Sequence, residues 1–386
     1  MFFEGYQRAD GSIGCRNLVG IISSVCCANE VTEAIARRVA GAVAFTHGEG
    51  CGRTPADLKV TEEVLVNLGQ NPNLGAVLVV GLGCESTPAL NLAEKIRQVG
   101  KPVESVVIQQ AGGMHEAVSK GVQKAQKLAV EVSSCPKVKA DPSQLVVAVK
   151  CGASDTTSGL AANPAVGKMA DLVVQHGGRV IIGETTEFIG AEHLLLERAA
   201  DENAAERLKQ IVTEMENSVL ACGVDMRGGQ PTKGNIAGGL TTIEEKSLGA
   251  IVKGGTSPIN EVIDYGRRPS RKGLVVMDSP GREPEILTGF AAAGAQIIVF
   301  TTGLGAPQGF PFVPVMKVCA NIHTVSRLSA HIDFDLSKIL AKEQTVEEAG
   351  ELLFKEVLSV ANGKKTQAEA NGYFCPTNIW ARGPVI

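Results

Sequence analysis

The sequence contains few aromatic residues, no excess of basic charge and no long apolar run. Aromatic side chains make up 4% of the 386 residues, and the formal net charge is −4 at pH 7. A chain without net positive charge has no electrostatic reason to bind nucleic acid or an anionic membrane surface. No uninterrupted apolar run approaches the ~20 residues that a membrane-spanning helix needs. These absences favour a soluble globular protein.

The start of the chain and its cysteine content predict a cytoplasmic location. The segment Met1–Gly5 carries neither the basic region nor the apolar region of a secretory signal. Ten cysteines are spread thinly over the chain, unlike the dense pattern of small secreted domains. In a reducing compartment, such cysteines serve packing, metal binding or catalysis more often than disulfides.

Apolar strand-like runs alternate with helical patterns along the chain. The predicted strands are Leu18–Ser23, Ala42–Phe45, Ala76–Val80, Val103–Ile108, Leu145–Val149, Arg179–Ile182, Leu274–Met277 and Gln296–Phe300. The predicted helices are Glu30–Val39, Pro55–Leu68, Ala89–Val99, His115–Val132, Ala165–Gln175, Ala191–Ser218 and Glu283–Ala292. This alternation predicts βαβ units and therefore an α/β fold with parallel sheets.

The chain is longer than one typical core, so we expect two Rossmann-like parallel-sheet domains with helices on both faces. We place an N-terminal α/β domain at 1–135 and a C-terminal α/β domain with long active-site loops at 144–386. The segment 133–143 contains two prolines and reads as a linker. We expect Gly223–Gly239 to be a long functional loop, and the irregular tail 371–386 to pack back through Trp380.

Three cysteines, Cys51, Cys84 and Cys151, each lie in a glycine-rich turn directly after a predicted strand. The carboxyl ends of parallel strands gather along one edge of a sheet, where ligands bind. Three thiols at such an edge could hold a soft or borderline metal, iron first among them. Burial in the core is the alternative, because free cysteines are among the most buried residues. We assign the other cysteines, such as Cys26 and Cys27, to packing.

Two further strand ends carry acidic and hydroxyl side chains. The turn after Cys151 contains Asp155 among hydroxyl groups, which suits either an anion cradle at a helix start or ordinary N-capping. Glu184 and Glu187 follow another strand, with His193 close behind, and could bind a metal or transfer protons. Alternatively, Glu187 is a first-turn carboxylate that faces the helix dipole.

The predicted loop Gly223–Gly239 contains Lys233 and Asn235 between glycines. A lysine in this setting could approach a substrate carboxylate, or act as a base if burial lowers its pKa. A flexible surface lysine is the alternative. The Walker A spacing is absent, so this loop is not a nucleotide P-loop.

Nine short motifs, in order along nearly the whole chain, resemble the altronate/galactarate dehydratase family. They lie at Gly5–Asn17, His47–Gly52, Gly81–Glu85, Cys151–Asp155, Ala162–Gly167, Glu184–His193, Lys233–Gly249, Met277–Gly281 and Thr301–Gly305. This family also includes the large subunit of (2R)-sulfolactate sulfo-lyase. That subunit is more similar over Gly229–Gly239 and Lys317–Asp335, whereas the Cys51 and Cys84 turns follow the sugar-acid dehydratases.

The resemblance implies a lyase that eliminates water from a sugar acid or a related 2-hydroxy carboxylate, with iron as cofactor. The enol that forms becomes a 2-keto acid. On this basis we assign Cys51, Cys84 and Cys151 to iron, as Fe²⁺ or as a 4Fe–4S cluster with one open iron site. The candidates for handling the substrate and its protons are Lys233, Glu184, Glu187, Asp155, Asn235 and His193.

Single-chain members of the family resemble this sequence preceded by a small β-rich domain, whereas this chain opens directly on Gly5–Gly11. We therefore expect a large catalytic subunit that binds a separate small subunit and forms an oligomer. A (2R)-sulfolactate sulfo-lyase that releases sulfite and pyruvate is the alternative enzyme. A non-catalytic iron or zinc binding protein, such as a redox sensor, is the alternative from another class.

Overall fold

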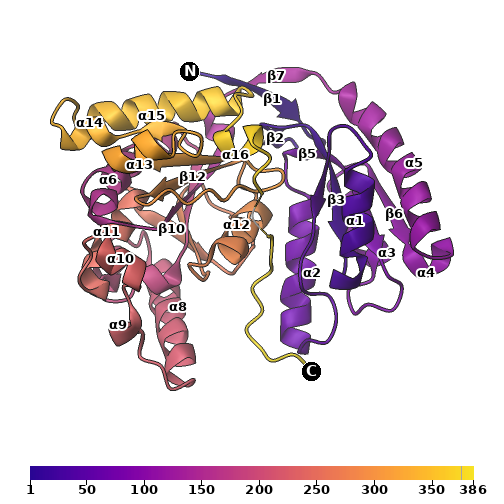
Figure 1. The fold of residues 1–386 in the computed structure, drawn as a ribbon, viewed down its shortest axis with the longest axis horizontal. Helices are drawn as coiled ribbons and strands as arrows, with labels where there is room; N and C mark the ends of the chain where they lie inside the picture. Colours follow the sequence, from indigo (N-terminus) through magenta and orange to yellow (C-terminus); the bar gives the residue numbers. More distant parts are fainter. Residues whose placement is uncertain (375) are drawn as a thin grey trace.

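A computed structural model of the chain describes residues 1–374 and 376–386 as a mixed α/β protein (Figure 1). A four-stranded and a seven-stranded parallel sheet form two lobes, and a three-stranded sheet lies at the N-terminus. The C-terminal segment descends between the two lobes in Figure 1. None of the helices in the described part of the chain combines the length and apolar character that a membrane-spanning segment needs.

The first lobe is a parallel sheet of strand order β4-β3-β5-β6. Its strands are β3 (Leu18–Ser23), β4 (Ala42–Phe45), β5 (Leu74–Gly81) and β6 (Val103–Val107). Helices α1 (Asn29–Ala36) and α5 (Met114–Ser133) cover one face, and α2 (Pro55–Gly69) and α3 (Ala89–Arg97) cover the other. The central strand β5 is buried along its whole length. A continuous apolar run of this kind is typical of a parallel strand covered on both faces.

The small sheet has the order β2-β1-β7 and is antiparallel. It consists of β1 (Phe3–Gln7), β2 (Ile13–Gly14) and β7 (Lys137–Ala140). The prediction of an unstructured linker over 133–143 is therefore wrong for Lys137–Ala140. This segment pairs with β1, which lies more than a hundred residues earlier in the chain, and local composition does not report such a distant partner.

The second lobe is a parallel sheet of order β10-β11-β9-β8-β12-β13-β14. Its strands are β8 (Val146–Gly152), β9 (Arg179–Ile182), β10 (Ile259–Ile263), β11 (Gly273–Met277), β12 (Ile297–Thr302), β13 (Val315–Cys319) and β14 (Phe334–Asp335). Helices α6 (Asn163–Gln175) and α15 (Val346–Ala361) cover one face. Helix α12 (Glu283–Ala292) covers the other face and packs against α2, so one apolar core joins the two lobes.

The remaining helices surround the second sheet and the strand ends. They are α4 (Ile108–Ala111), α7 (Glu192–Leu196), α8 (Glu202–Leu220), α9 (Met226–Gly229), α10 (Lys233–Ala237), α11 (Ile243–Ile251), α13 (Ile322–Arg327), α14 (Ser337–Leu340) and α16 (Gln367–Ala370), with short 3-10 or π turns η1 (Cys26–Ala28), η2 (Pro142–Gln144), η3 (Ser158–Ala162), η4 (Thr185–Glu187) and η5 (Val252–Gly254).

Two sequence predictions are corrected here. The long helix expected over Ala191–Ser218 is divided into α7 and α8, and the loop expected over Gly223–Gly239 contains α9 and α10. Helix α10 begins with a capping box at Thr232. The glycines in this segment have low helix propensity, so the sequence does not indicate a helix there.

The predicted α/β class and its parallel sheets are confirmed, and so is the packing of the tail. Trp380 lies against the apolar core, with its ring 5.6 Å from that of Tyr265. The chain enters the second sheet at β8, adds β9 on one side, and later adds β12 on the other. Such a change of direction opens a crevice at the carboxyl ends of the strands, which is where ligands bind in open α/β sheets.

Candidate active site

Buried charges gather at the carboxyl end of β8, where the direction of strand addition changes. Lys150 and Cys151 belong to β8, and Glu184 directly follows β9. The Nζ atom of Lys150 lies 3.0 Å from Oε1 of Glu184, and both side chains are at most 1% exposed. An ion pair so fully removed from water is stable only with good geometry and further hydrogen bonds.

Glu184 is held in an unusual backbone conformation. Its φ is +69° and its ψ is 55°, in the left-handed region that residues other than glycine rarely adopt. Ser279 Oγ accepts a hydrogen bond of 2.9 Å from the Glu184 amide, and the amide of Cys151 donates one of 3.0 Å to Oε2 of Glu184. Backbone strain of this kind clusters at functional sites.

Glu187 and Lys253 complete the buried cluster around the Cys151 thiol. The Sγ atom of Cys151 lies 2.8 Å from Oε2 of Glu187 and 3.4 Å from Nζ of Lys253. Lys253 also lies 3.0 Å from Oε2 of Glu184 and 3.4 Å from Oε2 of Glu187. The other oxygen of Glu187, Oε1, faces Nζ of Lys246 at 3.4 Å. Glu187 therefore presents one oxygen to the thiol and the other to Lys246.

The charges in the cluster reinforce one another. Burial alone would raise the pKa of Glu187, but the Lys246 and Lys253 ammonium groups outweigh burial and lower it to about 2. Burial would lower the pKa of Lys253, but the Glu184 and Glu187 carboxylates raise it instead. For Cys151, burial and the neighbouring Glu187 carboxylate raise the pKa of the thiol. At neutral pH Glu187 is therefore a carboxylate and Lys253 an ammonium group, and the Cys151 thiol keeps its proton.

A cavity of about 300 Å³ opens beside this cluster. Its ionisable lining side chains are Cys151, Asp155, Glu245 and Lys246, and its other polar lining side chains are Ser154, Thr156, Ser158 and Asn163. The cavity thus brings a cation, carboxylates and several hydroxyl groups to one surface. Such a lining can bind a small, polyhydroxylated anion.

Asp155 is fixed at the wall of the cavity. Its Oδ1 accepts hydrogen bonds from Thr157 Oγ1 at 2.7 Å and from the Ser158 amide at 3.0 Å, and its Oδ2 accepts one from Asn321 Nδ2 at 2.7 Å. Asp155 thus accepts a hydrogen bond from the amide of Ser158, the first residue of the π-helical turn η3, and π turns often occur at functional sites. Both interpretations of this turn, capping and site formation, remain compatible with its position.

The other predicted site residues lie in different surroundings. Asn235 is buried and donates a hydrogen bond of 2.9 Å to the carbonyl of Ser154, so it ties α10 to the cavity wall. Lys233 and His193 are exposed. Cys51 and Cys84 are exposed and follow strands of the first sheet, whereas Cys151 is buried in the second. The structure thus brings together Cys151, Glu184 and Glu187.

Within the described residues, these three side chains are the only group of three metal-ligating residues whose ligand atoms all lie within 4.8 Å of one another. One thiolate and two carboxylates form a donor set that suits a borderline cation such as Fe²⁺. Lys253 contacts the same three side chains, so a cation there would compete with its ammonium group. The residues are therefore compatible with a metal ion, and the three-cysteine iron assignment stays a prediction.

Three lysines of the site were not found from the sequence. Lys150 and Lys253 are buried, and Lys246 lies on the cavity wall. Two features of the sequence could have indicated them. Lys150 interrupts the apolar run of β8, and Lys246 follows two glutamates near the start of α11. Assigning these lysines to the site requires knowledge of their carboxylate partners, which are distant in sequence.

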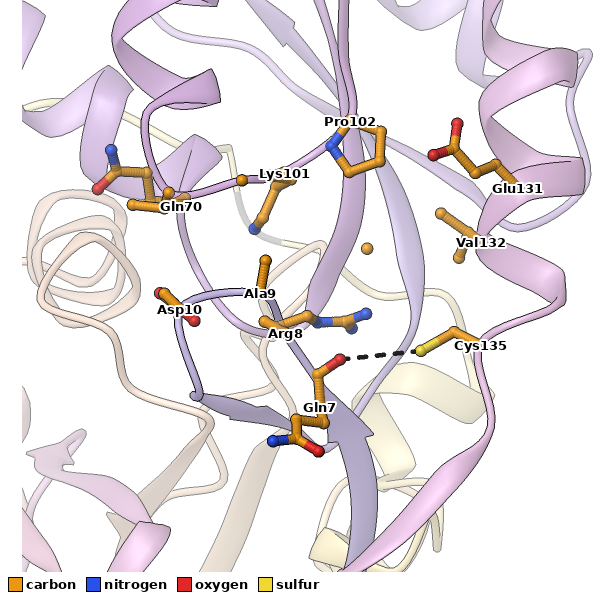
Figure 2. A pocket seen from close by; sticks show the side chains of 13 residues that line it. Gln7, Arg8, Ala9, Asp10, Gln70, Lys101, Pro102, Glu131, Val132 and Cys135 are labelled. Atoms are coloured by element: carbon orange, nitrogen blue, oxygen red, sulfur yellow. Dashed lines mark hydrogen bonds between the residues drawn. The ribbon is translucent and has the colours of Figure 1, made fainter.

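A second cavity, of about 170 Å³, lies in the first lobe beside β1 (Figure 2). Lys101 lines it and donates hydrogen bonds of 2.9 and 2.6 Å to the carbonyls of Gly69 and Asn71. Arg8, on another wall, donates one of 2.7 Å to the carbonyl of Pro72. Burial lowers the pKa of Lys101 well below its ordinary value. Both side chains hold backbone carbonyls in place, so we assign them a structural role.

The chain is similar to known proteins along nearly its whole length. The chain matches the family described as D-galactarate/altronate dehydratase, C-terminal, over residues 142–385, and the family described as D-galactarate dehydratase/altronate hydrolase, second domain, over residues 5–133. The cavity and its charged cluster lie in the first of these regions.

Curated relatives align along nearly the whole chain. The (2R)-sulfolactate sulfo-lyase subunit beta of Chromohalobacter salexigens is 39% identical over 96% of this chain and 95% of its own length. The galactarate dehydratase (L-threo-forming) of Escherichia coli is 37% identical over 94% of this chain and 73% of its own. The altronate dehydratase of Escherichia coli is 32% identical over 95% and 75%. The chain belongs to the D-galactarate/altronate dehydratase family.

Proposed function

We propose that the chain is a hydro-lyase that eliminates water from a sugar acid or a related 2-hydroxy carboxylate and yields a 2-keto acid. The observation that carries this proposal is the buried cluster of Cys151, Glu184, Glu187 and Lys253 next to a polar cavity that Lys246 lines. Family membership supports the reaction class, because the relatives named above include two sugar-acid dehydratases.

The cavity offers complementary groups to such a substrate. Lys246 presents a cation for the substrate carboxylate, and the side chains of Ser154, Thr156 and Ser158 line the cavity. The hydroxyl groups of Thr156 and Ser158 donate to Gly238 and Asp155, so towards a sugar hydroxyl they would act as acceptors. Elimination requires that the C2 proton leaves to a base while the C3 hydroxyl leaves with a proton from an acid. The substrate must therefore lie with C2 and C3 facing ionisable groups.

Glu187 is suited to both transfers, because the carboxyl group that has taken the C2 proton can give that proton to the leaving C3 hydroxyl, while Lys246 holds the substrate carboxylate. Oε1 of Glu187 faces Lys246 rather than the thiol, so this oxygen can accept the C2 proton. A substrate carboxylate that pairs with Lys246 weakens one of the charges that keep the pKa of Glu187 low, and so makes Glu187 a stronger base. The Lys246 ammonium stabilises the charge that develops on the substrate carboxylate. Lys150 and Lys253 keep Glu184 in place.

Iron held by Cys151, Glu184 and Glu187 would supply a Lewis acid that polarises the substrate. Iron at this position would replace the Lys253 ammonium group as the partner of these three side chains. Asp155 and Asn235 shape the cavity wall, and Asp155 orients the hydroxyl groups of Thr157 and Ser158. In this proposal Lys233 and His193 act outside the chemical step.

A second candidate is the release of sulfite from (2R)-sulfolactate. The observation in its favour is the alignment with the sulfo-lyase subunit over 95% of that protein's length. The same relative is named a subunit, which supports a separate small partner for this chain. We propose that such a partner increases turnover, and that the protein acts in the cytoplasm as an oligomer.

Product analysis tests the proposal. The purified chain is incubated with D-altronate, D-galactarate or (2R)-sulfolactate, and 2-keto acid and sulfite are quantified separately. A 2-keto acid formed from a sugar acid without sulfite supports the dehydratase. Sulfite with pyruvate supports the sulfo-lyase. A chain that binds iron or zinc and turns over none of these acids would support a non-catalytic binding protein.

A further inference from the structure

Four cysteines outside the cavity lie in three turns at the carboxyl end of the four-stranded sheet. Cys26 and Cys27 follow β3, Cys51 follows β4, and Cys84 follows β5. Because β3 pairs with both β4 and β5, the turns after these strands are neighbours. All four cysteines are exposed, so the prediction that Cys26 and Cys27 serve packing is wrong. Packing therefore does not explain this concentration of thiols.

The backbones of the three turns touch one another. The amide of Cys26 donates a hydrogen bond of 3.0 Å to the carbonyl of Glu49, and the amide of Ser86 donates one of 3.0 Å to the carbonyl of Gly50. A side chain at Gly50 would place its Cβ 2.4 Å from the carbonyl oxygen of Ser24, and Gly50 has a φ of +104°. Glycine is needed there for the turns to approach each other so closely.

We propose that Cys51, Cys84 and the Cys26–Cys27 pair bind an iron–sulfur cluster at this edge, separate from the cavity in the second lobe. Each of the three turns supplies at least one thiolate, as cluster ligation by cysteine requires. Cys151 is not among the ligands, because it is buried in the other sheet and its thiol contacts Glu187.

The thiols do not form a compact site for a single zinc ion. Zinc–sulfur bonds of ≈ 2.3 Å in a tetrahedral site place the sulfur atoms about 3.8 Å apart. Among the residues that the structure describes, no three of these cysteine sulfurs all lie within 4.8 Å of one another. A core of several iron and sulfide atoms spans a wider set of ligands than a single ion does.

The proposal is tested by anaerobic reconstitution of the full chain with Fe²⁺ and sulfide, followed by iron and acid-labile sulfide analysis and visible absorption. The wild-type chain is expected to hold about four iron and four sulfide atoms. The variants Cys51→Ser and Cys84→Ser, and the double variant Cys26→Ser/Cys27→Ser, are each expected to lose most of both. Cys222→Ser, which changes an exposed cysteine after α8, is the matched control and should retain them.

Cys151→Ser separates this proposal from an assignment that uses Cys51, Cys84 and Cys151. We expect Cys151→Ser to keep its sulfide content. The proposal is overturned if the wild type binds no sulfide, or if Cys151→Ser loses the cluster while the double variant keeps it. Circular dichroism of each variant shows whether the fold is retained. None of these readouts needs turnover, so they are independent of the proposed reaction.

Discussion

The Nζ atom of Lys253 lies 3.0 Å from Oε2 of Glu184, and neither side chain is more than 1% exposed. Each of these residues also contacts a second member of the cluster, because Lys253 reaches Glu187 and Glu184 reaches Lys150. Glu184 reaches this position only with a left-handed backbone, and Lys253 only from the turn η5. The pair therefore couples the end of β9 to the segment after α11.

Lys253→Met should destabilise the protein strongly. Removing one partner of a buried ion pair leaves an uncompensated charge and costs about 3–5 kcal/mol. Urea unfolding at pH 7 measures the loss, with Lys338→Met, an exposed lysine on α14, as the matched control. Equal losses for the two variants would show that the Lys253 pair contributes no more than a surface charge.

Lys246→Met should lower kcat/KM for the sugar acid substrate by about 10²-fold, as loss of a group that stabilises developing charge does. Lys233→Met is the informative comparison, because the sequence favours Lys233 whereas the structure places Lys246 on the cavity wall. We expect the Lys233 variant to lose far less. A larger loss of kcat/KM in Lys233→Met than in Lys246→Met would assign substrate binding to Lys233 instead.

Stability should fall in acid because of Glu187. Its pKa is lowered from an ordinary 4.5 to about 2, so its carboxylate stabilises the folded state above pH 4.5. That contribution is lost as the pH falls from about 4.5 toward 2, since protonation is then favoured in the unfolded chain first. Unfolding measured across this window should show a smaller acid loss in Glu187→Gln than in the wild type. If the stability of the two proteins fell equally with pH across this window, the low pKa of Glu187 would be contradicted.

Gly303→Ala should impair the cavity wall. A Cβ at Gly303 would lie 2.2 Å from Cγ of Asp155, so Asp155 or the strand end must move. We expect a stability loss of about 1–3 kcal/mol and a fall in turnover as large as about 10²-fold, because small misplacements in a site are costly. Gly228→Ala, whose added Cβ would meet its nearest atom at 4.0 Å, is the control. Unchanged kinetics in Gly303→Ala would remove Asp155 from the site.

Much of the fold follows from local patterns. The bounds of β4, β9 and α12 agree with the sequence predictions, because each is a continuous apolar or amphipathic run with clear ends. The sequence does not predict strand β7, because its partner β1 lies more than a hundred residues earlier in the chain. The sequence predicts one helix in place of α7 and α8, because the residues of both segments have high helix propensity.

The candidate site could be predicted only in part. Cys151, Glu184 and Glu187 could be predicted because they lie at or after the ends of strands. These strands are neighbours in a parallel sheet, so their carboxyl ends bring the three side chains close together. Lys150 has the pattern of a core residue, and only its distance of 3.0 Å to Glu184 reveals a buried ion pair. Cys51 and Cys84 also follow strands, but of the other sheet, and sequence alone does not assign strands to sheets.

The most direct test of the proposed hydro-lyase function is to measure 2-keto acid formation from D-altronate and D-galactarate by the wild type and by Glu187→Gln. Iron is supplied in excess, and folding is checked by circular dichroism. We expect the wild type to form a 2-keto acid from one of these acids without releasing sulfite, and folded Glu187→Gln to be slower by about 10²-fold or more. Equal rates for the two proteins, or no product from the iron-supplied wild type, would contradict it.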